Sequence, residues 1–175
     1  MNRFFNAAEL EKVGDAAVSA EEMVNNYFKL SSGQWLKSRY DIRTARDLER
    51  HERLDGPYAQ VVKYEGRPDE QLLGSDAYTL YRICIQDHCI LNALDAHPAL
   101  RLEPFLIYIL VHELVHVVRF LRFKHRYENS GEAGVTREEE ARVHGLTCEI
   151  VVSVGGEGMG KVIEFFRQWH GGNAR

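Results

Sequence analysis

The sequence predicts an α+β domain in which a twisted sheet packs beside a long buried helix and further helices follow. Three observations carry this prediction. Residues 58–64 and 77–91 are rich in β-branched and aromatic residues, as strands are. Residues 105–123 form an apolar run of helical length. Residues 136–170 then show the periodicity of two further helices.

The first third of the chain begins with a predicted helix and then becomes harder to interpret. Residues 6–30 look helical, and Ser19 with Glu22 forms the pattern of a capping box within them. Residues 34–54 are charged and fit either a short helix or a mobile linker. Residues 58–64 then form the first predicted strand.

The long helix follows a second extended region. Residues 77–91 suit a strand, although their alternation is imperfect, and residues 92–100 suit a loop or short helix. Pro104 fits the first turn of the next helix. Because this helix is apolar on every side, we expect it to be buried.

Two C-terminal helices are expected after the long one. Thr136 and Glu139 form a capping-box pattern that begins a helix ending near Gly155. Residues 158–170 then form an amphipathic helix. We expect one compact domain overall, with residues 1–55 as a helical region of unknown role and residues 56–175 as the main domain.

Composition narrows the functional classes. The chain has 175 residues, of which 45% are hydrophobic and 27% charged, as in an ordinary soluble protein. Its net charge of −4 argues against nucleic acid as the main partner. Three widely spaced cysteines and an N-terminus without the apolar core of a signal peptide predict a cytoplasmic location.

The apolar run at residues 105–123 must also be weighed as a membrane helix. It contains His112, Glu113, His116 and Arg119, and such side chains are costly inside a bilayer. We therefore expect no membrane partner and interpret the run as the central helix of a protein core.

The most informative residues of this run are His112, Glu113 and His116, which form an HExxH motif. Side chains four residues apart share one face of a helix, so both imidazoles can bind the same metal ion. Glu113 can then point at a metal-bound water, as a zinc-dependent hydrolase requires. The competing interpretation is a pair of core histidines that satisfy each other or Glu113.

A catalytic zinc usually has three protein ligands. The position six residues after His116 is Arg122, which excludes the metzincin arrangement with its third histidine. On the later helix, Glu138 and Glu140 both flank the predicted buried face, and the helical wheel does not decide between them. His144 is a further alternative, as the third ligand or as a side chain that orients one.

The pairing of His112-Glu113-x-x-His116 with Glu138-x-x-Ala141 resembles the gluzincin type of zinc metallopeptidase. It looks most like small bacterial and phage-element peptidases whose second motif is a glutamate three residues before an alanine. The resemblance covers residues 111–151 and selects Glu138 as the third ligand. Those families often continue with an aromatic residue and alanine, where this chain has His144-Gly145.

The resemblance implies a small zincin-like domain with one Zn²⁺ ion and Glu113 as general base. It further implies an endopeptidase that acts on a protein or peptide substrate. It also implies an edge strand that binds extended peptide, for which residues 77–91 are the candidate. The alternative is a non-catalytic binding module of the same fold, with a structural metal or none.

Overall fold

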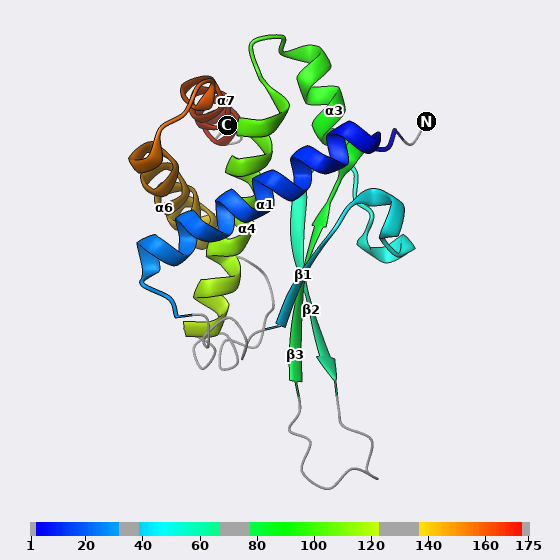
Figure 1. The fold of residues 1–175 in the computed structure, drawn as a ribbon, viewed down its shortest axis with the longest axis vertical. Coiled ribbons are helices and arrows are strands. Elements are labelled where there is room, and N and C mark those ends of the chain that lie inside the picture. Colours follow the sequence, from blue (N-terminus) through cyan, green and yellow to red (C-terminus); the bar gives the residue numbers. More distant parts are fainter. Residues whose placement is uncertain (1–2, 32–38, 67–77, 123–136, 173–175) are drawn as a thin grey trace, which may run out of the picture.

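The predicted α+β class is confirmed by a computed structural model that describes residues 3–31, 39–66, 78–122 and 137–172 (Figure 1). The elements in chain order are α1 (Ala7–Phe28), β1 (Arg39–Arg43), the 3₁₀ turns η1 (Ala45–Asp47) and η2 (Arg50–Glu52), β2 (Ala59–Gly66), β3 (Tyr78–Ile85), α3 (Asp87–Ala96), α4 (Leu102–Arg122), α6 (Arg137–Val154) and α7 (Met159–Gly172).

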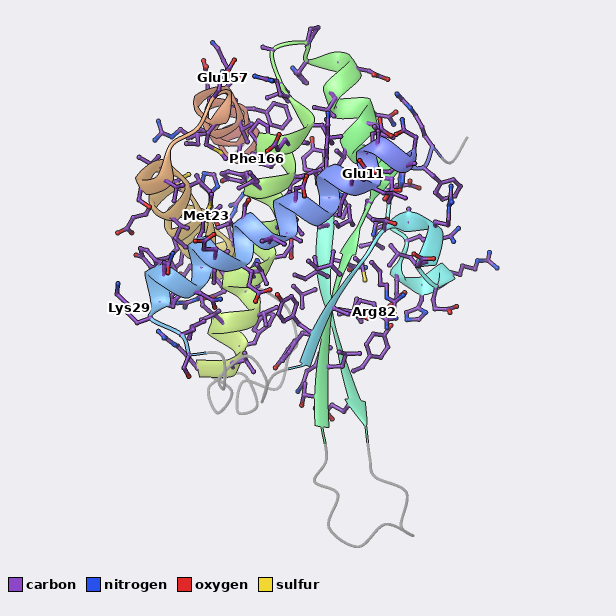
Figure 2. The ribbon with its side chains drawn as sticks, viewed as in Figure 1. Glu11, Met23, Lys29, Arg82, Glu157 and Phe166 are labelled. Atoms are coloured by element: carbon purple, nitrogen blue, oxygen red, sulfur yellow. The ribbon has the colours of Figure 1, made fainter. Side chains whose placement is uncertain are left out.

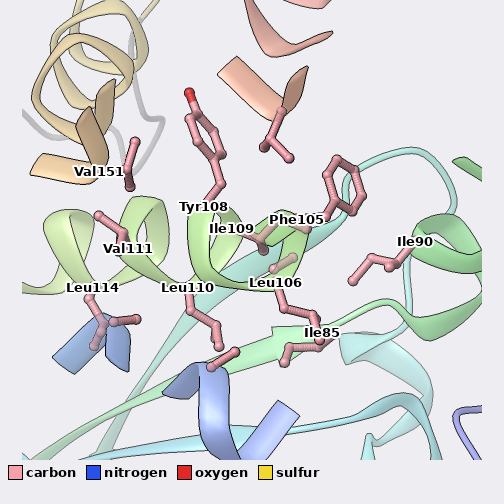
Figure 3. Packing of buried hydrophobic residues seen from close by; sticks show 14 of the residues in the cluster. Ile85, Ile90, Phe105, Leu106, Tyr108, Ile109, Leu110, Val111, Leu114 and Val151 are labelled. Carbon is pink, nitrogen blue, oxygen red and sulfur yellow. The ribbon is translucent and has the colours of Figure 1, made fainter. Parts of the chain in front are cut away.

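Helix α4 is the centre of the molecule. It contacts α1, α6, α7 and β2, and its side chains form most of the core in Figure 3. The helix is long and apolar enough to cross a bilayer, yet 78% of its most apolar window is buried inside the protein. The expected buried helix is therefore confirmed, and packing on all sides explains its composition.

The sheet has the strand order β1-β3-β2, with β3 parallel to β1 and antiparallel to β2. Side chains alternate across it. Tyr81 and Ile83 are buried, and the Tyr81 ring stacks on Phe120 of α4 with centroids 6.1 Å apart. Arg82 lies on the opposite side (Figure 2). The sequence did not predict β1, because this five-residue segment contains three charged residues and becomes a strand by pairing with β3.

The second extended region ends earlier than predicted. β3 stops at Ile85, and Asp87 begins helix α3, so Cys89 lies on a helix and not in a strand. A short apolar run fits either period, and the tertiary structure decides. The buried Asp87 carboxylate accepts hydrogen bonds from the backbone N–H groups of Phe5 and Ala45, which anchors the start of α3.

Helix α1 was predicted correctly, but its cap was not. The N-cap is Asn6, whose side chain accepts a hydrogen bond from the Glu9 N–H while the Glu9 carboxylate accepts one from the Asn6 N–H. Ser19 lies inside the helix. Figure 1 shows α1 crossing α4, and its buried residues belong to the same hydrophobic cluster as those of α4 and α7.

The C-terminal helices bring acidic residues back to α4. Helix α6 packs on α4 and ends at Val154, as predicted, while Thr136 lies outside the described residues. The turn into α7 includes Gly158 at φ +88°, where a Cβ would lie 3.2 Å from Pro104 Cγ. This glycine allows α7 to begin close to the start of α4.

Candidate metal centre

Two helices assemble a group of three possible metal ligands. His112 and His116 come from successive turns of α4, and their Nε2 atoms lie 3.2 Å apart. Glu140, on the first turn of α6, reaches both rings: Oε2 lies 3.3 Å from His112 Nε2 and Oε1 lies 3.2 Å from His116 Nε2. Among the described residues, these three form the group that could hold a metal ion.

The spacing of these atoms fits one small cation. In a tetrahedral site with metal–nitrogen bonds of zinc length, neighbouring ligand atoms lie about 3.3 Å apart. The Nε2 atoms of His112 and His116 lie 3.2 Å apart, and each ring contacts a different Glu140 oxygen, at 3.3 Å and 3.2 Å. Both rings present the same nitrogen, Nε2, and one ligand atom from each of the three residues lies within 4.8 Å of the others, which is close enough for a single ion.

The electrostatics of the centre also favour a cation. Hydrogen bonds with the two histidines hold the pKa of Glu140 far below its ordinary value, so the carboxylate is ionised. Burial lowers the pKa of His116, but the hydrogen bond with Glu140 and the charge of Glu113 outweigh burial and raise it. The His116 ring is therefore in a negative environment that stabilises a positive charge at its Nε2.

Glu113 lies on the same helix, one residue after the first histidine, and is 7% exposed. Burial raises the pKa of its carboxyl, and the negative charge of Glu140 adds to that effect, while the two histidines oppose it. A carboxyl with a raised pKa is better matched to proton transfer near neutral pH than an exposed glutamate.

The centre opens into a cavity of about 410 Å³. Glu113 and all three candidate ligands line it, together with one edge of the sheet and several aromatic rings. The residues along its wall are Pro57, Tyr58, Ala59, Gln60, Val61, Tyr108, Ile109, Phe120 and Phe166. A small ligand group can therefore reach the metal centre from outside.

The strand beside this cavity differs from the one we expected. We proposed residues 77–91 as the edge strand, but β3 is the central strand, paired with β1 and β2 on its two sides. The edge strand that lines the cavity is β2, through Ala59, Gln60 and Val61. The expectation failed because β1, which occupies the other side of β3, was not recognised as a strand.

Three consecutive glutamates begin α6, and the one that meets the histidines is not the one that the resemblance implies. Glu140, which the sequence left open, joins the donor group, whereas Glu138, which the resemblance selected, is exposed. Glu139 is buried and pairs with Arg119. The sequence did contain a signal: Glu140 is followed at four-residue intervals by His144 and Cys148, which marks one polar stripe facing α4.

His144 lies one helical turn beyond Glu140 and takes another role. Its Nδ1 is hydrogen-bonded to the Tyr108 hydroxyl, and its Nε2 lies 3.8 Å from Cys148 Sγ. Tyr108 is in turn four residues before His112 on α4. Tyr108 could not be predicted from the sequence, because a tyrosine in an apolar run is indistinguishable from a packing residue until its partner is known.

Comparison of the chain with models of known protein families, with curated proteins and with solved structures found no match. The functional interpretation therefore rests on the chemistry of the centre.

Proposed function

We propose that this protein is a zinc-dependent peptidase whose metal is held by His112, His116 and Glu140. The observation that carries the proposal is the convergence of two imidazoles and one carboxylate, with one ligand atom of each within 4.8 Å of the others, beside a buried glutamate and an open cavity. Bound Zn²⁺ supplies two effects in such a site: it acidifies a water and it polarises a carbonyl.

Glu113 is the general base in this proposal. Its carboxylate takes a proton from the attacking water and delivers the proton to the amide nitrogen as the peptide C–N bond breaks. Its place one residue after His112 and its wall position in the cavity support this role.

An extended peptide is the substrate that the cavity wall fits best. Among the strands that the structure describes, β2 pairs with β3 alone, so we propose that its other backbone edge pairs with an added strand. Tyr58 and Phe166 provide apolar walls for side chains of that peptide. The three cysteines are free thiols, which supports action in a reducing compartment such as the cytoplasm.

The test combines metal analysis with one substitution. We expect the purified protein to contain one zinc ion per chain and to cleave members of a mixed peptide library, detected by mass spectrometry. A Glu113→Gln variant should retain zinc and lose turnover by about 10² to 10⁴-fold, because only the proton acceptor is removed.

Two results would contradict the proposed peptidase activity. One is Glu113→Gln activity equal to that of the unmodified chain. The other is a zinc-loaded protein that binds no hydroxamate inhibitor, because a closed structural site has no exchangeable position. The latter result would favour a non-catalytic binding module instead.

A further inference from the structure

A buried ion pair joins α4 to α6 next to the metal centre. The Arg119 guanidinium donates from Nε and Nη2 to both Glu139 oxygens, and the Nη2–Oε2 distance is 3.0 Å. The two side chains are only 12% and 10% exposed. Arg119 comes three residues after His116, and Glu139 comes directly before Glu140. The ion pair therefore lies about one helical turn from His116 on α4 and one residue from Glu140 on α6.

The first turn of α6 needs such a constraint. A helix turns about 100° per residue, so Glu138, Glu139 and Glu140 point in three different directions. All three are glutamates, so residue type does not determine which one meets the histidines. The described part of α6 begins at Arg137, and the first turn of a helix lacks the backbone bonds that hold later turns.

The Arg119 guanidinium can fix the orientation of this first turn. It binds both oxygens of one carboxylate, which fixes direction as well as distance. With Glu139 fixed on Arg119, the rotation of α6 directs the next residue, Glu140, toward His112 and His116. On the other side of the centre, the hydrogen bond between Tyr108 and His144 joins the same two helices.

We infer that Arg119 and Glu139 are positioning residues that preorganise Glu140 as the third metal ligand. This inference rests on the proposed zinc centre. Without the ion pair, Glu140 must be ordered at the moment of metal binding, and that entropic cost weakens the affinity.

The experiment measures zinc affinity by competition with a chelator, and the thermal stability of the metal-free protein in parallel. Arg119→Met and Glu139→Gln should each weaken zinc binding about 10- to 100-fold, the range found for partners that orient ligands. Arg119→Lys, which keeps the charge but not the fork, should recover part of the affinity. The double variant should bind no more weakly than either single variant, because both remove one interaction.

Arg122→Met provides the matched control. Arg122 lies on α4 three residues after Arg119. Its Nη2 donates to the Phe28 carbonyl at the end of α1, 2.9 Å away, and not to α6. This variant should bind zinc like the unmodified chain.

The outcomes separate the two proposals. Unchanged zinc affinity in Arg119→Met, whatever its stability, would overturn the positioning role and leave the zinc centre intact. Equal weakening in Arg122→Met would also overturn it, because the effect would then be general destabilisation. An unmodified protein that binds no zinc would overturn the zinc centre and the positioning role together.

Discussion

Two clusters of ionisable side chains, each containing a buried glutamate, lie on opposite faces of the sheet, and they are built differently. On the side away from α4, Arg82 donates to both oxygens of Asp41 and, at 3.2 Å, to Glu52 (Figure 2). Tyr64 also donates to Glu52, at 2.6 Å. Burial raises the pKa of Glu52, but these hydrogen bonds outweigh burial and lower it. The cluster supplies its own cation.

The cluster on α4 has no permanently charged cation. His112, Glu113, His116 and Glu140 all line the cavity, and no lysine or arginine is among the described residues of its wall. The pKa of the buried Glu113 is raised, in contrast to that of Glu52. A cluster with an internal cation already has its charge balanced, whereas a cluster without lysine or arginine beside a cavity can accept a cation from solution.

The largest expected difference between the clusters concerns the third ligand. Glu140→Gln should weaken zinc binding by more than about 100-fold, the upper end of the effect of removing a partner that only orients a ligand. Glu138→Gln is the matched control, because Glu138 is exposed on the same turn of α6. Equilibrium dialysis with zinc measures both, and equal affinities would remove Glu140 from the donor set.

The next effect is on the other side of the sheet. Arg82→Met should lower the free energy of unfolding by about 2 to 4 kcal/mol, because Glu52 is left buried without its cation. Zinc affinity should stay unchanged as long as the variant is folded. Urea unfolding and dialysis test the two statements, and a large loss of zinc affinity in the folded variant would show that the clusters are coupled.

The smallest expected effect is a pH dependence. The stability of the metal-free protein should decrease as pH rises, whereas the stabilisation by zinc should increase. The pKa of His116 is raised from 6.5, so protonated His116 stabilises the metal-free protein at low pH, and this is lost as pH rises through the folded value. The pKa of Glu140 is lowered from 4.5, so its contribution disappears only in acid.

Zinc must displace the His116 proton, so its apparent affinity should rise about tenfold per pH unit below the folded pKa of His116 and then level off. Melting temperatures with zinc and with a chelator, taken from pH 5.5 to 8, check this behaviour. The stabilisation by zinc should grow with pH, and a constant difference would mean that zinc does not replace a proton on His116.

Much of the helical architecture could be predicted from local patterns. The apolar run predicted α4 as a buried helix, and the HExxH spacing predicted two histidines on one face. The strands were predicted less well. β1 has no recognisable pattern of its own, and without it the edge strand was assigned to residues 77–91 and not to β2.

The identity of the third ligand could not be predicted from local sequence patterns. Glu138 and Glu140 flank the same helical face, and a short motif chose between them by analogy. In the folded chain, Arg119 binds Glu139 and thereby sets the rotation of α6. That contact joins residues 20 apart in sequence across two helices, so no window of sequence contains it.

The sequence by itself determined the elements whose cause is local: a helix apolar on every side, and two imidazoles one turn apart. Only the tertiary structure decided which carboxylate meets them and which strand borders the cavity. The physical reason is that helix rotation and strand order are fixed by contacts between segments distant in the chain, which hydrophobic periodicity does not encode.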